Sequence, residues 1–148
     1  MKTIEKSVLI WYSPAQMYKL VTAVADYPKF LPWCDHADVL SSSPRGMTAE
    51  IGISFGGIRQ TFTTKNTHVE GRQVKLRLIN GPFSKLDGQW NFLPLGDGSQ
   101  RACKIELTLT YGFDNAAMDL LVGPVFDSIA DSLVDAFVKR AEQVYATP

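Results

Sequence analysis

The residues best suited to chemistry in this chain are the neighbouring Cys34, Asp35 and His36, with a second histidine, His68, farther along. A thiol, a carboxylate and an imidazole can bind zinc, and a Cys–His pair can act in nucleophilic catalysis. Zinc requires three or four converging ligands, and no second ligand cluster accompanies this group in the sequence. The pair also lacks a recognisable third group to orient the histidine. We therefore expect neither a metal site nor a catalytic centre.

The charged residues do not indicate acid–base catalysis either. Apolar residues alternate with Lys75, Arg77, Lys104 and Glu106, which places these charges on the outer side of the predicted strands. No pair of carboxylates stands out to share the roles of general acid and general base. We expect a protein that is not an enzyme and requires no cofactor.

Composition limits the classes of partner. The 148 residues suit a single domain, residues 1–148, which can bury a core without disulfides or metal ions. Fifteen basic residues balance fifteen acidic ones, so the chain lacks the positive excess that broad binding to DNA requires. The apolar run Val8–Tyr12 is too short for a signal peptide or a membrane span. We therefore expect a cytoplasmic protein that binds no DNA.

The elements that must position these residues begin with a strand at residues 3–11 and a helix. Ser13 and Gln16 form the sequence pattern of a capping box at the helix start. We expect the helix to end near Asp26, because Pro28 forces the residue before it out of the helical region.

Residues 27–34, with the sequence YPKFLPWC, form a stiff elbow after this helix. Its two prolines fix the backbone and hold Phe30, Leu31 and Trp33 at a set angle. Such an elbow either packs into the core or forms the lip of a pocket for an apolar ligand. The sequence pattern leaves both alternatives open.

From Ala37 to Tyr111 the apolar residues alternate with a period of two, which predicts about six antiparallel strands joined by short turns. Gly56-Gly57 and Gly96-Asp97-Gly98 are two of these turns. The C-terminal residues return to helical spacing, and Gly123-Pro124 is expected to kink or interrupt this last helix near its start. The predicted fold class is α+β, a helix grip in which a curved antiparallel sheet of about seven strands wraps around a long C-terminal helix.

Three segments resemble hallmarks of the coenzyme Q-binding START-like family of the polyketide cyclase/START superfamily, which includes bacterial ribosome-association toxins of the RatA type. They are residues 24–34 (VADYPKFLPWC), residues 81–92 (GPFSKLDGQWNF) and residues 136–141 (AFVKRA). The segments occur in the order typical of the family and span nearly the whole chain. We therefore identify the chain as similar to this family.

The resemblance implies a hydrophobic tunnel that binds ubiquinone or a similar isoprenoid lipid and supports respiratory electron transport. The candidate ligand-binding residues are the large apolar ones of the elbow, of one predicted strand and of the last helix. They are Phe30, Leu31, Trp33, Phe83, Leu86, Trp90, Phe92, Phe126, Ile129, Leu133 and Phe137. Periodicity places many of them inside, but it does not separate ligand contact from core packing.

The resemblance also implies alternative partners. Some family members block the association of ribosomal subunits, and a basic face for such docking would use Arg59, Lys65, Arg72, Lys75, Arg77 and Lys85. Lipid loading implies transient contact with the inner face of the membrane, through the elbow and Gly81-Pro82-Phe83. Related helix-grip proteins include polyketide cyclases and dehydratases, so an enzyme of that kind is a further alternative.

Overall fold

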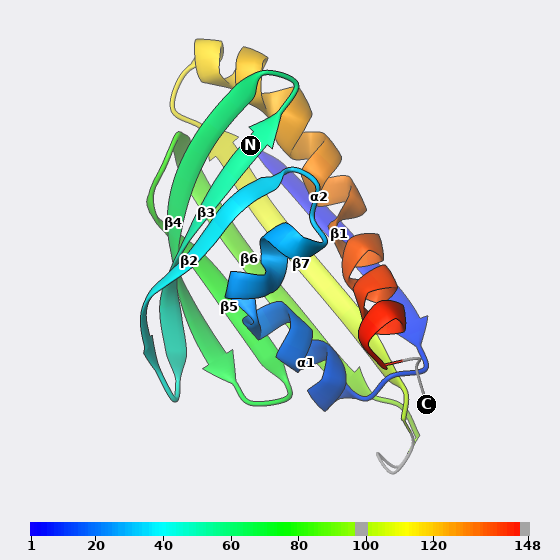
Figure 1. Ribbon diagram of the computed structural model, residues 1–148. Coiled ribbons are helices and arrows are strands. Elements are labelled where there is room, and N and C mark those ends of the chain that lie inside the picture. The colour runs from blue at the N-terminus through cyan, green and yellow to red at the C-terminus, as the bar shows by residue number, and fades with distance from the viewer. Residues whose placement is uncertain (97–100, 146–148) are drawn as a thin grey trace.

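Seven antiparallel strands form one curved sheet (Figure 1). The structure, a computed structural model, describes residues 1–96 and 101–145. The strand order is β1-β7-β6-β5-β4-β3-β2, so β2 to β7 form a meander and β1 adds beside β7. The strand bounds are β1 Lys2–Ile10, β2 Cys34–Ser43, β3 Gly46–Phe55, β4 Ile58–Val69, β5 Gln73–Asn80, β6 Phe83–Pro94 and β7 Cys103–Phe113. This confirms the predicted sheet.

Gly56 and Gly57 make the β3–β4 turn as predicted. Their φ angles are 58° and 81°, and a two-residue hairpin turn of this kind requires positive φ at both positions. Of the turn predicted at residues 96–98, Asp97 and Gly98 lie outside the described residues.

Helix α1, Pro14–Thr22, begins with the predicted capping box. The Ser13 hydroxyl accepts a hydrogen bond from the Gln16 amide at 3.1 Å, and the Gln16 side chain accepts one from the Ser13 amide at 2.8 Å. The predicted end near Asp26 was wrong. The chain tightens after Ala23 into the 3₁₀ helix η1, Val24–Lys29, because the Asp26 amide donates to the Ala23 carbonyl at 3.0 Å.

Helix α2 runs without interruption from Ala116 to Tyr145. Of the kink or interruption predicted at Gly123-Pro124, the interruption was therefore wrong. Pro124 has no N–H to donate to the carbonyl of Leu120. Leu120 is 78% exposed and Pro124 is also exposed. Water can therefore satisfy the free carbonyl, and the helix continues.

The helices cover the concave face of the sheet (Figure 1). Helix α2 crosses it, α1 packs against β5, β6 and β7, and η1 packs against β2. Two groups of buried apolar side chains form the core. One surrounds Phe126 and Ile129, and the other surrounds Phe137 with Trp90 and Phe92. The eleven candidate residues therefore belong to the region where the sheet grips α2.

Strand β4 departs from the apolar pattern of the inner face. After Phe62, the alternate positions carry Thr64, Asn66 and His68. Thr64 and Asn66 are 4% and 7% exposed, and they are the buried polar residues among those that the structure describes. The wall that faces α2 is therefore not uniformly hydrocarbon.

Candidate functional site

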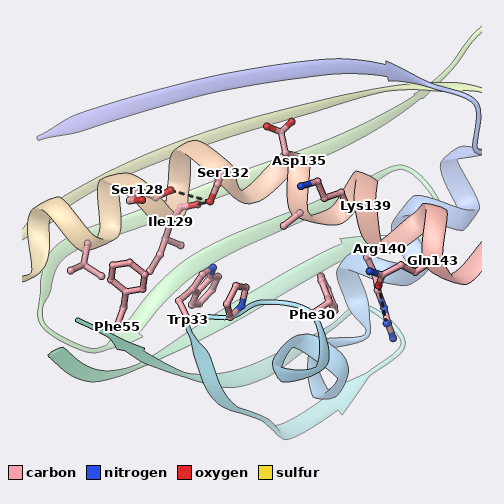
Figure 2. A pocket seen from close by; sticks show the side chains of 13 residues that line it. Phe30, Trp33, Phe55, Ser128, Ile129, Ser132, Asp135, Lys139, Arg140 and Gln143 are labelled. Carbon is pink, nitrogen blue, oxygen red and sulfur yellow. Dashed lines mark hydrogen bonds between the residues drawn. The ribbon is translucent and has the colours of Figure 1, made fainter. Parts of the chain in front are cut away.

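An open groove of about 450 Å³ lies between the elbow and the side of α2 that faces it (Figure 2). Phe55, Val125, Ile129 and Trp33 give it an apolar part near the beginning of α2. The volume lies within the range of about 300–1,000 Å³ that small-molecule sites usually have. The groove is thus large enough for a substantial apolar ligand.

The other part of the groove is basic. Arg140 lies over the Phe30 ring, 5.1 Å from its centroid, and donates a hydrogen bond to the Gln143 side chain at 3.5 Å. Lys139 also lines the groove, and neither it nor Arg140 forms an ion pair with a residue that the structure describes. The groove therefore changes from apolar to cationic along α2.

A second, inner cavity of about 90 Å³ lies between the sheet and α2. Its walls are mostly apolar and include Trp90, Leu109, Phe126 and Phe137. An engineered apolar cavity of about 150 Å³ holds one benzene molecule, so the inner cavity does not accept a ring at its present size. Neighbouring side chains would have to move to admit one.

Trp33 and Ile129 line both the groove and the inner cavity, so they form the partition between the two spaces. The indole of Trp33 extends from the elbow toward α2 (Figure 2). Its backbone is fixed, because the Trp33 carbonyl accepts a hydrogen bond from the Ser54 amide at 2.8 Å. A change in the side-chain position of Trp33 would therefore connect the two spaces while the backbone stayed in place.

The structure brings most of the candidate residues to the inner cavity. Those that line it are Trp33, Leu86, Trp90, Phe126, Ile129, Leu133 and Phe137. Phe30 lines the groove instead.

Leu31, Phe83 and Phe92 line neither of these two spaces. Leu31 and Phe92 are fully buried, and Phe83 is 3% exposed and stacks on Phe113 with ring centroids 5.0 Å apart. Because its ring is buried, Phe83 is not placed to make the membrane contact expected of the Gly81–Phe83 loop. These three side chains pack the core.

The sequence analysis missed the polar corner of the inner cavity, which Thr64 and Asn66 form. The Thr64 hydroxyl donates a hydrogen bond to the Asn66 side-chain oxygen at 2.8 Å. Every second residue of β4 faces inward, so following this pattern from Phe62 along the strand would have identified both residues. Tyr27 was also missed. It lines the cavity, and its hydroxyl donates to the carbonyl of Val21.

The Cys34 thiol and the His36 imidazole do not contact each other as a thiol–imidazole pair would. The Cys34 thiol is buried and donates to the His36 carbonyl at 3.4 Å, and burial raises the pKa of this thiol to about 11. The His36 imidazole instead contacts the carboxylates of Asp35 at 2.8 Å and Glu50 at 3.5 Å. Among residues 1–96 and 101–145, no three His, Cys, Asp or Glu side chains are placed to hold a metal ion.

The outer face of the sheet carries a basic hollow, defined by Lys65, Lys75 and Arg77. Lys65 and Arg77 are directly opposite each other on β4 and β5, where two like charges destabilise strand pairing. Asp87 also lines the hollow, but its recorded ion pair is with Lys85 at 3.5 Å. Within the described part of the chain, the three cations have no ion-pair partner.

None of the described helices has the length and apolarity needed to cross a membrane.

A curved antiparallel sheet that grips one long helix defines the helix-grip class of domains. A family model described as polyketide cyclase / dehydrase and lipid transport matches residues 10–138, and the chain belongs to this family. This confirms the resemblance that the three sequence segments indicated.

Two similar proteins carry different names. The ribosome association toxin RatA of Escherichia coli (strain K12) is 43% identical over 146 residues, which cover 99% of this chain and 90% of that protein. The mitochondrial coenzyme Q-binding protein COQ10 homolog B of Xenopus laevis is 27% identical over 141 residues, covering 95% of this chain and 58% of that protein.

Among solved structures, the Zhui aromatase/cyclase of a Streptomyces species superposes with a TM-score of 0.82. It is 14% identical in sequence, and the match covers 96% of this chain and 94% of that one. At this identity the likeness establishes the fold alone, and the fold is the helix grip that the sequence predicts.

Proposed function

We propose that this protein binds an isoprenoid lipid, such as a polyprenyl quinone, without transforming it. The observation that carries the proposal is the groove of about 450 Å³ beside an inner apolar cavity, with Trp33 and Ile129 as the described residues that line both. A long, narrow and mostly apolar ligand fits this arrangement better than a compact polar substrate does. The similarity to a protein named for coenzyme Q binding supports the same class of ligand.

Burial of hydrocarbon would provide the affinity. Each CH₂ group moved from water into an apolar lining contributes about 0.8 kcal/mol, so one five-carbon isoprene unit contributes about 3–4 kcal/mol before the entropy of binding is subtracted. Few polar contacts are then needed. Acid–base catalysis usually requires more than one polar group at the reacting atoms. Among the described residues that line the groove, Asp135 is the one carboxylate. A lone exposed carboxylate favours binding without a chemical reaction. We propose that the protein acts as a cytoplasmic carrier and contacts the inner face of the membrane when it takes up lipid.

The test is native mass spectrometry of freshly purified protein, followed by extraction and identification of any bound lipid. Trp33→Ala should reduce the loaded fraction, because it removes a large part of the apolar lining of both spaces. Trp11→Ala is the matched control, since Trp11 is 80% exposed and lines neither space. Equal loading of wild type and both variants, or a wild type that never carries lipid, would refute the proposal.

A second candidate function is association with the large ribosomal subunit, which would block subunit joining. The specific observations that favour it are the 43% identity to the ribosome association toxin RatA over nearly the whole chain and the basic hollow of Lys65, Lys75 and Arg77. Unpaired cations on an outer sheet face suit the phosphates of ribosomal RNA. This role uses the face opposite α2, so it is compatible with a bound lipid.

Sucrose-gradient sedimentation with ribosomal subunits tests this second function. The double substitution Lys75→Glu and Arg77→Glu should abolish co-sedimentation and restore subunit joining. Lys19→Glu with Lys29→Glu changes the net charge equally on α1 and η1, away from the hollow, and should have little effect. Equal loss in both double variants would indicate attraction by net charge and count against docking by the basic hollow.

A further inference from the structure

The polar corner of the inner cavity offers a specific hydrogen-bonding group in an otherwise apolar wall. Thr64 and Asn66 point inward from β4, are almost fully buried, and line the cavity together with Trp90 and Phe137. A buried polar group usually has a partner within the protein, because an unmet hydrogen bond costs about 1–3 kcal/mol. The partners of these two side chains therefore indicate what the cavity is built to receive.

Within this polar corner, the amide nitrogen of Asn66 has no hydrogen-bond partner among the described residues; farther along β4, the buried Nε2 of His68 also has none. An asparagine side chain has an oxygen that accepts hydrogen bonds and a nitrogen that carries two donors. The oxygen accepts from the Thr64 hydroxyl at 2.8 Å, which fixes the orientation of the amide. No hydrogen bond joins the nitrogen to another residue within the described ranges. The cavity wall thus presents a donor that a ligand oxygen can satisfy.

We propose that Asn66, held by Thr64, binds a carbonyl oxygen at the head of the ligand, while the apolar chain extends into the groove. This inference rests on the proposed lipid-binding function and adds to it the subsite for the head group. A quinone carbonyl is an acceptor without a donor, so it matches the free N–H groups of Asn66. The remaining apolar walls would pack against the ring.

The position of Trp33 makes the arrangement sterically feasible. The inner cavity of about 90 Å³ is too small for a ring, but the groove of about 450 Å³ begins on the other side of the Trp33 indole (Figure 2). Displacing this one side chain joins the two spaces. The head then reaches Asn66, and the chain passes between the elbow and α2.

A matched pair of probes tests the proposal. Menadione is a two-ring quinone with two carbonyl oxygens, and 2-methylnaphthalene has the same ring skeleton without them. Binding of each is measured by calorimetry to the wild type, to Asn66→Leu and to Thr64→Val. Thermal unfolding of each variant shows whether it is folded, and Thr64→Val serves as the milder change should Asn66→Leu fail to fold.

For wild type we expect menadione to bind more tightly than 2-methylnaphthalene, and Asn66→Leu to weaken menadione about 3- to 10-fold, the usual effect of one neutral hydrogen bond. Thr64→Val should weaken menadione less. Binding of 2-methylnaphthalene should be unchanged by either substitution. The Asn66 side-chain amide signals in a ¹⁵N–¹H spectrum should also shift with menadione and not with the hydrocarbon.

Two other outcomes are informative in different ways. If both probes bind equally well to all three proteins, the lipid-binding function stands and the role of Asn66 is refuted. If neither probe binds to wild type and no quinone co-purifies with it, the proposed function and the head-group subsite are both refuted.

Discussion

Filling the inner cavity should stabilise the protein while it prevents ligand binding. Ala49 on β3 is 1% exposed and lines this cavity, so the substitution Ala49→Leu places three additional carbon atoms there. The prediction concerns the sign of the change in stability, which depends on whether the space is empty. A side chain added to a filled core destabilises it.

The expected magnitude can be obtained in two ways. Three buried carbons at about 0.8 kcal/mol each contribute about 2.4 kcal/mol. Filling a cavity of about 90 Å³ at about 24 cal/mol per Å³ gives about 2 kcal/mol. Ordering the leucine side chain costs about 0.5–1 kcal/mol, so the free energy of unfolding should rise by about 1.5 kcal/mol.

Urea denaturation monitored by tryptophan fluorescence measures this change, and menadione titration of the same variant measures the loss of binding. A gain of about 1.5 kcal/mol corresponds to a rise in melting temperature of about 3–6 °C for a chain of this length. Ala130→Leu is the control. Ala130 is fully buried on α2 but does not line the cavity, so overpacking should lower stability by about 1–3 kcal/mol. If Ala49→Leu also lowers stability, the reasoning from an empty cavity is wrong.

Two further predictions concern residues outside the cavity. Phe83→Ala should lower the free energy of unfolding by about 3–5 kcal/mol, because Phe83 packs between Phe113 and Phe126. At temperatures where the variant stays folded, its lipid loading, measured by mass spectrometry, should match that of the wild type. Burial opposes ionisation of Asp127, but its hydrogen bonds from Lys2 and Tyr111 outweigh this and lower its pKa below the usual value near 4. This carboxylate therefore stabilises the fold above its unfolded pKa, and the contribution is lost as the pH falls through the lowered, folded pKa. Asp127→Asn should be less stable than wild type at pH 7, and urea titrations between pH 7 and pH 2 should show the difference shrinking in acid; a constant difference would contradict this assignment.

Local sequence rules predicted the parts of the fold that depend on a few neighbouring residues. The capping box of Ser13 and Gln16 and the turn at Gly56-Gly57 both formed as expected, because each depends only on residues that are neighbours in the chain. The effect of Pro124 was not predictable in this way. Whether a proline interrupts a helix depends on what surrounds the carbonyl it leaves free, and here that carbonyl lies on the exposed side.

Periodicity also limited the prediction of the site. It assigned Phe92 and Trp90 to the same inward face, and both are buried, but only Trp90 reaches the cavity. The difference arises from where each residue lies along the strand relative to α2, which alternation does not encode. The polar run on β4 was visible in the sequence, yet the significance of Asn66 depends on its distance from Thr64 and from the opposite wall.

The hydrogen bond between the Trp33 carbonyl and the Ser54 amide has a consequence for the speed of ligand exchange. Lids that swing on hinges open in microseconds to milliseconds, because many contacts break together. Here the main chain of the elbow stays attached to β3, and prolines stiffen it on either side of Phe30. Torsional motion of a single indole would then open the passage for a guest molecule. The residence time would be set by the length of hydrocarbon held and not by a concerted rearrangement of the domain.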